Sequence, residues 1–159
     1  MDVLWQELIY GLPDGRHLAI VMIRVTAAII LGGILGIQRE RARKPAGLRT
    51  HMIVCLGTSV VVLACLSSSM DMSGLSRVVQ GIVTGIGFIG AGSILKLSEQ
   101  REIRGLTTAA GLWMTAAIGV AVGLGSLGVA LIGTAATFIV LSVVGAVESR
   151  LEKRDNRRA

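Results

Sequence analysis

Five apolar stretches dominate the chain, and each has the length, about 20 residues, that a helix needs to cross the hydrocarbon core of a membrane. Short polar connections join them, and no long linker divides the chain. With 159 residues, 52% of them hydrophobic, and a mean hydropathy of +0.71, the chain has more apolar surface than one soluble core of this size buries. The sequence therefore predicts an all-α integral membrane bundle of five transmembrane helices, at residues 18–37, 52–70, 78–97, 106–123 and 127–147.

The two ends of the chain differ from this bundle. In residues 2–12 apolar side chains recur at helical spacing near Trp5 and Tyr10, which is typical of a short helix lying in the membrane interface. This stretch begins with acids and lacks the basic start of a signal peptide. We expect residues 1–17 to form an N-terminal interfacial segment, residues 18–147 the transmembrane domain, and residues 148–159 a charged cytoplasmic tail.

The distribution of basic residues predicts an orientation. If the N-terminus lies outside, 13 of the 16 Lys and Arg residues fall in the inner loops and the tail, and only Arg16 and Arg77 lie outside. Such an excess on the cytoplasmic side is the rule for membrane proteins. It also accounts for the net charge of +6 without nucleic acid, since no nucleic-acid-binding motif accompanies it.

Small residues gather on the expected helices, especially the third. In lipid, helices associate by close packing, which glycine permits. We expect these glycines either to pack within the bundle or to form a subunit interface in a homodimer. The expected packing residues are Gly32, Gly36, Gly81, Gly85, Gly87, Gly90 and Gly92.

Arg24 is the one charge placed well inside an expected span. A charge at that depth is costly unless it reaches the headgroups or finds a polar partner. Gln80 and Thr84 reach a similar depth from the same side. Arg24 is therefore expected either to extend to the outer headgroups or to form an intramembrane polar centre with Gln80 and Thr84.

The inner ends of the helices indicate an anion site. Two of the helices that start there begin with similar tetrapeptides, GLRT at residues 47–50 and GLTT at residues 105–108. Helix N-termini beside arginines attract phosphate and carboxylate groups. The simpler alternative is general contact with anionic lipid. The residues expected to contact an anion or a partner are Arg39, Glu40, Arg49, Thr50, Arg104, Thr107 and Thr108, with Glu40 pairing with an arginine.

The chain shows no arrangement of residues that is typical of a catalytic or metal-binding site. No Asp or Glu lies within the five expected spans, although Mg²⁺ sites use carboxylates. No nucleotide-binding or catalytic motif is present, and His17 and His51 are isolated. We therefore expect no enzyme activity, no cofactor and no metal site.

Several motifs occur in a fixed order between Arg24 and about Val122. They are GGILGIQRE at residues 32–40, AGLRTH at 46–51, RVVQGIVTGIGFIGAG at 77–92 and RGLTTAA at 104–110, followed by Trp113. In order and spacing they resemble the MgtC/SapB family of bacterial membrane proteins, whose members usually carry an acid where Gln38 stands here. The chain resembles a short form that lacks the soluble C-terminal domain of many relatives.

The resemblance implies a plasma-membrane protein linked to magnesium homeostasis and, in some pathogens, to virulence and ATP-synthase regulation. Combined with the residues above, it predicts a non-catalytic regulator or interaction protein with a basic cytoplasmic face. Its expected partners are anionic lipid headgroups, another membrane complex and a second copy of the chain. The alternative is a transporter of Mg²⁺ or another small solute.

Overall fold

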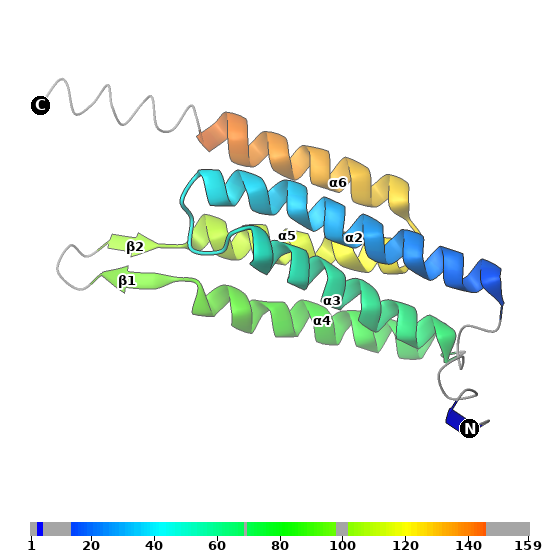
Figure 1. The fold of residues 1–159 in the computed structure, drawn as a ribbon. Helices are drawn as coiled ribbons and strands as arrows, with labels where there is room; N and C mark the ends of the chain where they lie inside the picture. Colours follow the sequence, from blue (N-terminus) through cyan, green and yellow to red (C-terminus); the bar gives the residue numbers. More distant parts are fainter. Residues whose placement is uncertain (1–2, 5–13, 69, 98–101, 146–159) are drawn as a thin grey trace, which may run out of the picture.

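The computed structural model describes residues 3–4, 14–68, 70–97 and 102–145 (Figure 1). Within these ranges, five helices are long and apolar enough to span a membrane. They are α2 (Gly15–Arg41), α3 (Leu48–Ser67), α4 (Met72–Gly92), α5 (Leu106–Gly123) and α6 (Leu127–Ile139), which a π-helix, η1 (Val140–Val144), continues. The five-helix prediction is confirmed. The expected interfacial helix and charged tail lie almost wholly outside the described residues.

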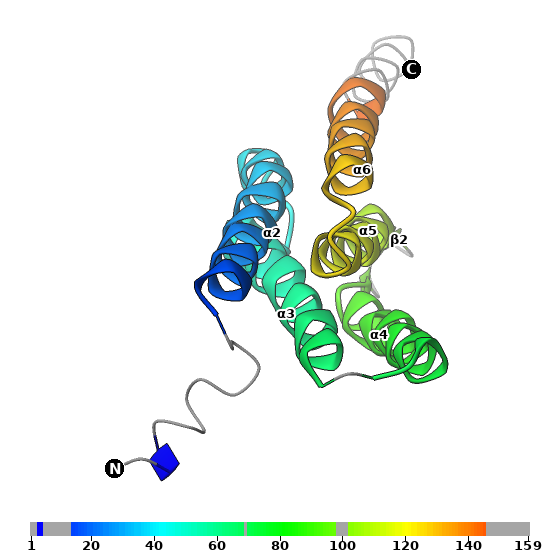
Figure 2. The same cartoon turned by 90° about the vertical axis from the view of Figure 1, so that its right-hand side faces the viewer.

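The helix α5 is the centre of the bundle. More than half of its residues are buried, whereas fewer than one in five are buried in α4 or in the last span. Seen along the bundle, α2 and α3 lie on one side of α5, while α4 and α6 lie at opposite edges (Figure 2). The outer helices expose large apolar side chains such as Phe88 and Ile132, as helices in contact with lipid do.

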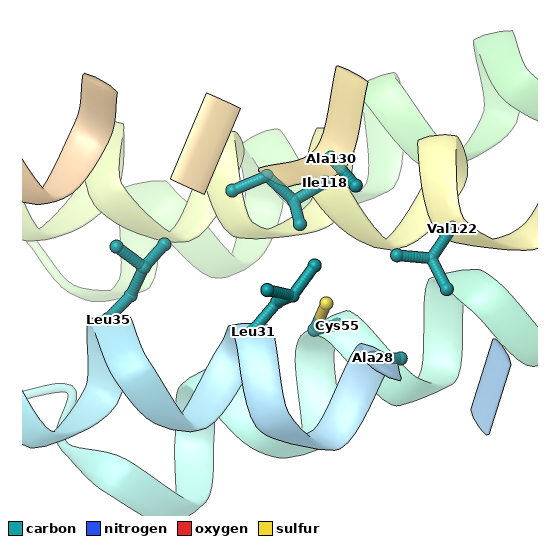
Figure 3. Close-up of a cluster of buried hydrophobic side chains, with 7 residues drawn as sticks. All are labelled: Ala28, Leu31, Leu35, Cys55, Ile118, Val122 and Ala130. Atoms are coloured by element: carbon teal, nitrogen blue, oxygen red, sulfur yellow. The ribbon is translucent and has the colours of Figure 1, made fainter. Parts of the chain in front are cut away.

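The main apolar core lies where α2, α3, α5 and α6 meet (Figure 3). Gly32 and Gly36 bring α2 against α3 so closely that a Cβ atom on Gly36 would lie 2.6 Å from Leu48 Cα. Gly119 and Gly123 bring α5 against α3 in the same way. The buried side chains of this core are Ala28, Leu31, Leu35, Cys55, Ile118, Val122 and Ala130.

The third predicted span was placed too far along the chain. Helix α4 ends at Gly92, because the N–H groups of Ser93 and Ile94 turn back to the carbonyls of Gly90 and Ala91. The following residues form an antiparallel hairpin of β1 (Leu95–Leu97) and β2 (Glu102–Arg104). Gly105 then turns the chain with a φ of +99°, which favours glycine, and α5 begins. The expected span reached residue 97 because the apolar residues of β1 continue the hydropathy pattern of the helix before it.

Candidate functional site

The end of α2 and the starts of α3 and α5 meet at one end of the bundle, which we call the basic end (Figure 1). Gly47 and Gly105 are the N-cap residues of α3 and α5, so the similar tetrapeptides do open two helices. Arg41, Arg43 and Lys44 are exposed beside them. The unpaired N–H groups of two helix N-termini and these cations give this end a positive potential.

Arg39 lies inside the basic end rather than on its surface. Its side chain is only 2% exposed, and its Nη2 donates to Thr108 Oγ1 at 3.0 Å. Its Nε has no hydrogen-bond partner. The structure therefore brings Arg39 and Thr108 together, but Arg39 cannot reach an external partner as we had expected.

A second buried pair lies deeper in the bundle. His51 is fully buried, and its Nδ1 lies 2.7 Å from Thr115 Oγ1. The Thr115 hydroxyl donates to the carbonyl of Gly111 at 2.8 Å. Since a hydroxyl has one proton, we assign the proton of this pair to His51 Nδ1. The other ring nitrogen, Nε2, is then an acceptor, and it has no partner.

The other residues expected at the anion site are spread over the surface. Arg49 and Thr107 are exposed, and Thr50 is half-buried. Arg104 is exposed as well, and it has an interaction of its own.

Glu40 does not pair with an arginine in the part of the chain that the structure describes. Its Oε2 accepts from the backbone N–H of Leu48 at 2.9 Å and so caps α3. A carboxylate is the group that a helix N-terminus favours, and the expected ion pair is therefore replaced by a cap.

The expected polar centre around Arg24 is not formed within the described chain. Arg24 Nη1 donates to the carbonyl of Gly123 at 2.8 Å, and its guanidinium lies against Gly125, whose φ of +84° forms the turn into α6. Gln80 and Thr84 are exposed on α4, and α3 and α5 lie between α2 and α4 (Figure 2). Arg24 is instead a cap on the C-terminal end of α5.

The expected packing glycines divide into two groups. Gly32 and Gly36 are tightly packed against α3, and Gly90 contacts Ala109 of α5. A Cβ atom placed on any of the four remaining expected glycines, all on α4, would meet nothing within 4 Å. The glycine face of α4 therefore lies open, and the residues that form it are Gly81, Gly85 and Gly92; Gly87 is also exposed but points to another side of the helix.

An apolar groove of about 340 Å³ lies between α2 and α6, lined by residues such as Leu31, Ile34 and Phe138. Gln38 bridges the same two helices by donating to the carbonyl of Leu141 in η1, at 3.1 Å. The groove thus offers apolar walls, which suit a lipid chain better than a hydrated ion. In the described residues no group of three or more His, Cys, Asp or Glu residues is placed to hold a metal.

His51, Thr115 and Ser59 are polar residues of the buried interior that the sequence analysis did not select. The sequence does contain a pattern that could have identified this buried face of α3. His51, Cys55 and Ser59 recur at every fourth position, so they share one face of α3. A polar or small face inside an apolar segment marks the side that faces other helices.

Five membrane-spanning helices around this polar interior define a multi-pass membrane protein. The model of the MgtC family matches residues 25–150, and the chain belongs to that family. It is 39% identical to Protein SrpB of Synechococcus elongatus, over 82% of this chain and 78% of SrpB. No solved structure matches the chain.

Two further relatives are longer than this chain. The putative magnesium transporter YhiD of Escherichia coli is 38% identical over 84% of this chain and 65% of its own length. Protein MgtC of Salmonella typhimurium is 43% identical over 76% of this chain and 49% of its own length. The match therefore spans about half of MgtC.

Proposed function

We propose that this protein is a non-catalytic regulator or interaction protein of the bacterial plasma membrane, connected with magnesium homeostasis. Family membership and the name of the relative YhiD support the link to magnesium. Its partner is an acidic segment of another membrane complex or a surface of anionic headgroups, and its basic end makes the contact.

The gathering of exposed cations around two helix starts carries this proposal. Arg41, Arg43 and Lys44 lie just before α3 and Arg49 lies in its first turn, at the end of the bundle where α5 also begins. Arginine and helix N-termini both favour carboxylate and phosphate. Because basic loops remain on the cytoplasmic side, the basic end faces the cytoplasm and the N-terminus lies outside. A cysteine in place of Arg43 should then react with an impermeant thiol reagent only in opened cells. Labelling in intact cells would contradict this orientation.

Binding to anionic vesicles tests the proposed contact. Each basic residue near such a surface contributes about 1 kcal/mol, so Arg49→Gln should weaken binding by roughly fivefold and reduce its salt dependence. Arg77→Gln is the matched control, because Arg77 is exposed at the opposite end of the bundle. Equal effects of the two substitutions would contradict a specific role for the basic end.

The open glycine face of α4 supports a homodimer. Gln80 and Thr84 lie exposed on α4 beside Gly81 and Gly85, and a second copy of α4 would give these polar groups partners in the membrane. Native mass spectrometry in mild detergent measures the oligomeric state. A monomer at every concentration would contradict the dimer.

Transport of Mg²⁺ or another small solute is the second candidate, and the name of YhiD favours it. The apolar groove and the lack of a carboxylate cluster in the described chain weigh against a cation path. Flux into liposomes that contain the purified protein separates the two functions. Saturable Mg²⁺ flux that Arg49→Gln leaves unchanged would favour the transporter.

A further inference from the structure

Among the residues that the structure describes, Arg39 is a buried cation that pairs with no acidic side chain. It is almost completely enclosed, its one hydrogen bond goes to the neutral hydroxyl of Thr108, and its Nε–H has no acceptor. The nearby carboxylate of Glu40 is exposed and accepts from Leu48 instead. A buried charge persists at low cost only when an opposite charge lies beside it. None of the acidic side chains that the structure describes supplies this opposite charge, so the charge of Arg39 points to an anion from elsewhere.

His51 adds a complementary requirement. With its proton on Nδ1, directed to Thr115, the imidazole presents a bare lone pair on Nε2, which is buried and unpartnered. This atom needs a hydrogen-bond donor. Four buried polar atoms of the described chain lack a partner, namely Gln38 Oε1, Arg39 Nε, His51 Nε2 and Ser59 Oγ. Of these, Arg39 Nε–H is a charged donor without an acceptor, and His51 Nε2 is an imidazole acceptor without a donor.

The side chains of Arg39 and His51 both contact one face of α5. That face carries Thr108, Gly111 and Thr115. Arg39 is hydrogen-bonded to Thr108, and His51 is hydrogen-bonded to Thr115. Gly111 lies between them. A Cβ atom on Gly111 would meet only Cε1 of His51, at 3.7 Å, and Cε1 is bonded to the unpartnered Nε2. The missing side chain of Gly111 therefore leaves room beside the imidazole of His51, on the face of α5 that Arg39 also contacts.

We propose that the position over Gly111 binds a small oxyanion that still carries a proton, with bicarbonate as the simplest example. An oxygen of the ligand accepts from Arg39 Nε–H, and its hydroxyl donates to His51 Nε2. Its negative charge neutralises the guanidinium, and the nearby N-terminus of α5 adds to the attraction.

Simpler occupants meet only part of this requirement. Water completes both hydrogen bonds but leaves the charge of Arg39 uncompensated. A halide compensates the charge but has no proton for His51. The site is independent of the partner proposed above, because Arg39 and His51 are buried and cannot touch an external surface.

Thermal unfolding of the full chain, purified in mild detergent, tests this site. Sodium bicarbonate is compared with sodium formate and sodium chloride at equal pH and ionic strength. A ligand that binds only the folded protein raises Tm in a saturable way. Bicarbonate should do so at concentrations roughly tenfold or more below those of the other two anions, because formate and chloride lack the hydrogen bond to His51.

Gly111→Ala is the discriminating variant, because its methyl group occupies the proposed position. The chain should tolerate it, since the one close contact is at an ordinary distance and Ala favours a helix over Gly. The bicarbonate effect should disappear in this variant. It should persist in Gly57→Ala, the matched control at an exposed position of α3, where the added methyl group meets nothing within 4 Å.

A direct measurement keeps the test decisive even if Gly111→Ala fails to fold. Solid-state NMR of the wild-type protein should detect contact between ¹³C-labelled bicarbonate and ¹⁵N-labelled arginine, and Arg39→Lys should abolish that contact. The proposal is overturned if the contact is absent, if chloride matches bicarbonate, or if a folded Gly111→Ala variant keeps the full bicarbonate effect.

Discussion

Two arginines on α2 contact opposite ends of α5, and their surroundings differ in a way that separates structure from function. Arg24 donates to the carbonyl of Gly123, at the C-terminal end of α5, where a cation complements the negative end of the helix dipole. Arg39 contacts Thr108 in the first turn of α5, at the positive end of the same dipole.

The burial of a charged side chain indicates a function only when its partners within the protein are also known. Arg24 has the partner that a helix C-terminus provides, so its role in holding α5 and the following turn in place is complete. Arg39 is placed where a helix favours anions, and it keeps an unpartnered Nε. In the sequence, Arg24 stands out because it falls inside an expected span, whereas in the structure Arg39 is the arginine with an unpartnered buried charge.

The largest expected effect on the free energy of unfolding comes from disrupting the contact between α2 and α3 near Arg39. Gly36 lies one turn before Arg39, and a Cβ atom there would lie 2.6 Å from the backbone of Leu48. Gly36→Ala should therefore lower the free energy of unfolding by about 3 kcal/mol. Gly57→Ala, at an exposed position of α3 where a Cβ atom meets nothing within 4 Å, should be neutral or stabilise by up to about 1 kcal/mol. Denaturant unfolding in micelles measures both, and equal values would contradict the close packing of α2 on α3.

The next largest effect on the free energy of unfolding is expected when each of the two arginines is replaced by Met. Arg24→Met removes a hydrogen bond to a charged group and should lower the free energy of unfolding by about 2 kcal/mol. In buffer without bicarbonate, Arg39→Met should be neutral or stabilising, because replacing an uncompensated buried charge by an apolar side chain relieves its desolvation cost. The same unfolding measurement checks both variants. A greater loss for Arg39→Met than for Arg24→Met would show that Arg39 already has a counter-charge.

The sequence predicted the helices better than the site because hydropathy is local and the site is not. The starts of α5 and α6 were placed at the observed residues, since Gly105 and the turn after Gly123 interrupt the apolar pattern. Thr108 was selected for its place at a helix start. His51 and Thr115 are 64 residues apart, and neither carries a local signal strong enough to show that α3 and α5 pack face to face. Hairpin β1–β2 was missed because its first strand is apolar.

A smaller effect concerns the carboxylate at the basic end. Glu40→Gln keeps an oxygen that can accept from Leu48 but removes the charge that favours the N-terminus of α3. The expected loss in free energy of unfolding is about 0.5 to 1 kcal/mol, and added salt should shrink it. Unfolding at low and high salt measures this difference. A loss that is independent of salt would indicate that the contact of Glu40 acts through geometry rather than charge.

The smallest effect lies at the end of the bundle where Arg24 is found. Asp14 caps α2 by accepting from the backbone N–H of His17 at 2.7 Å, and this bond, together with the His17 ring, holds the pKa of Asp14 below its ordinary value. A lowered carboxyl pKa contributes stability above the unfolded pKa of about 3.9. That contribution is lost as the pH falls through the folded pKa.

Asp14→Asn keeps the acceptor but cannot titrate, so its stability should change less than that of the wild type below about pH 4. Unfolding curves recorded from pH 6 to pH 3 measure the difference, and the carboxyl carbon chemical shift of Asp14 reports its pKa directly. Because Asp14 is exposed, the effect should be slight. Identical acid profiles, or a carboxyl group that titrates above the ordinary range, would show that capping at this end does not depend on charge, in contrast to the cap that Glu40 forms at the basic end.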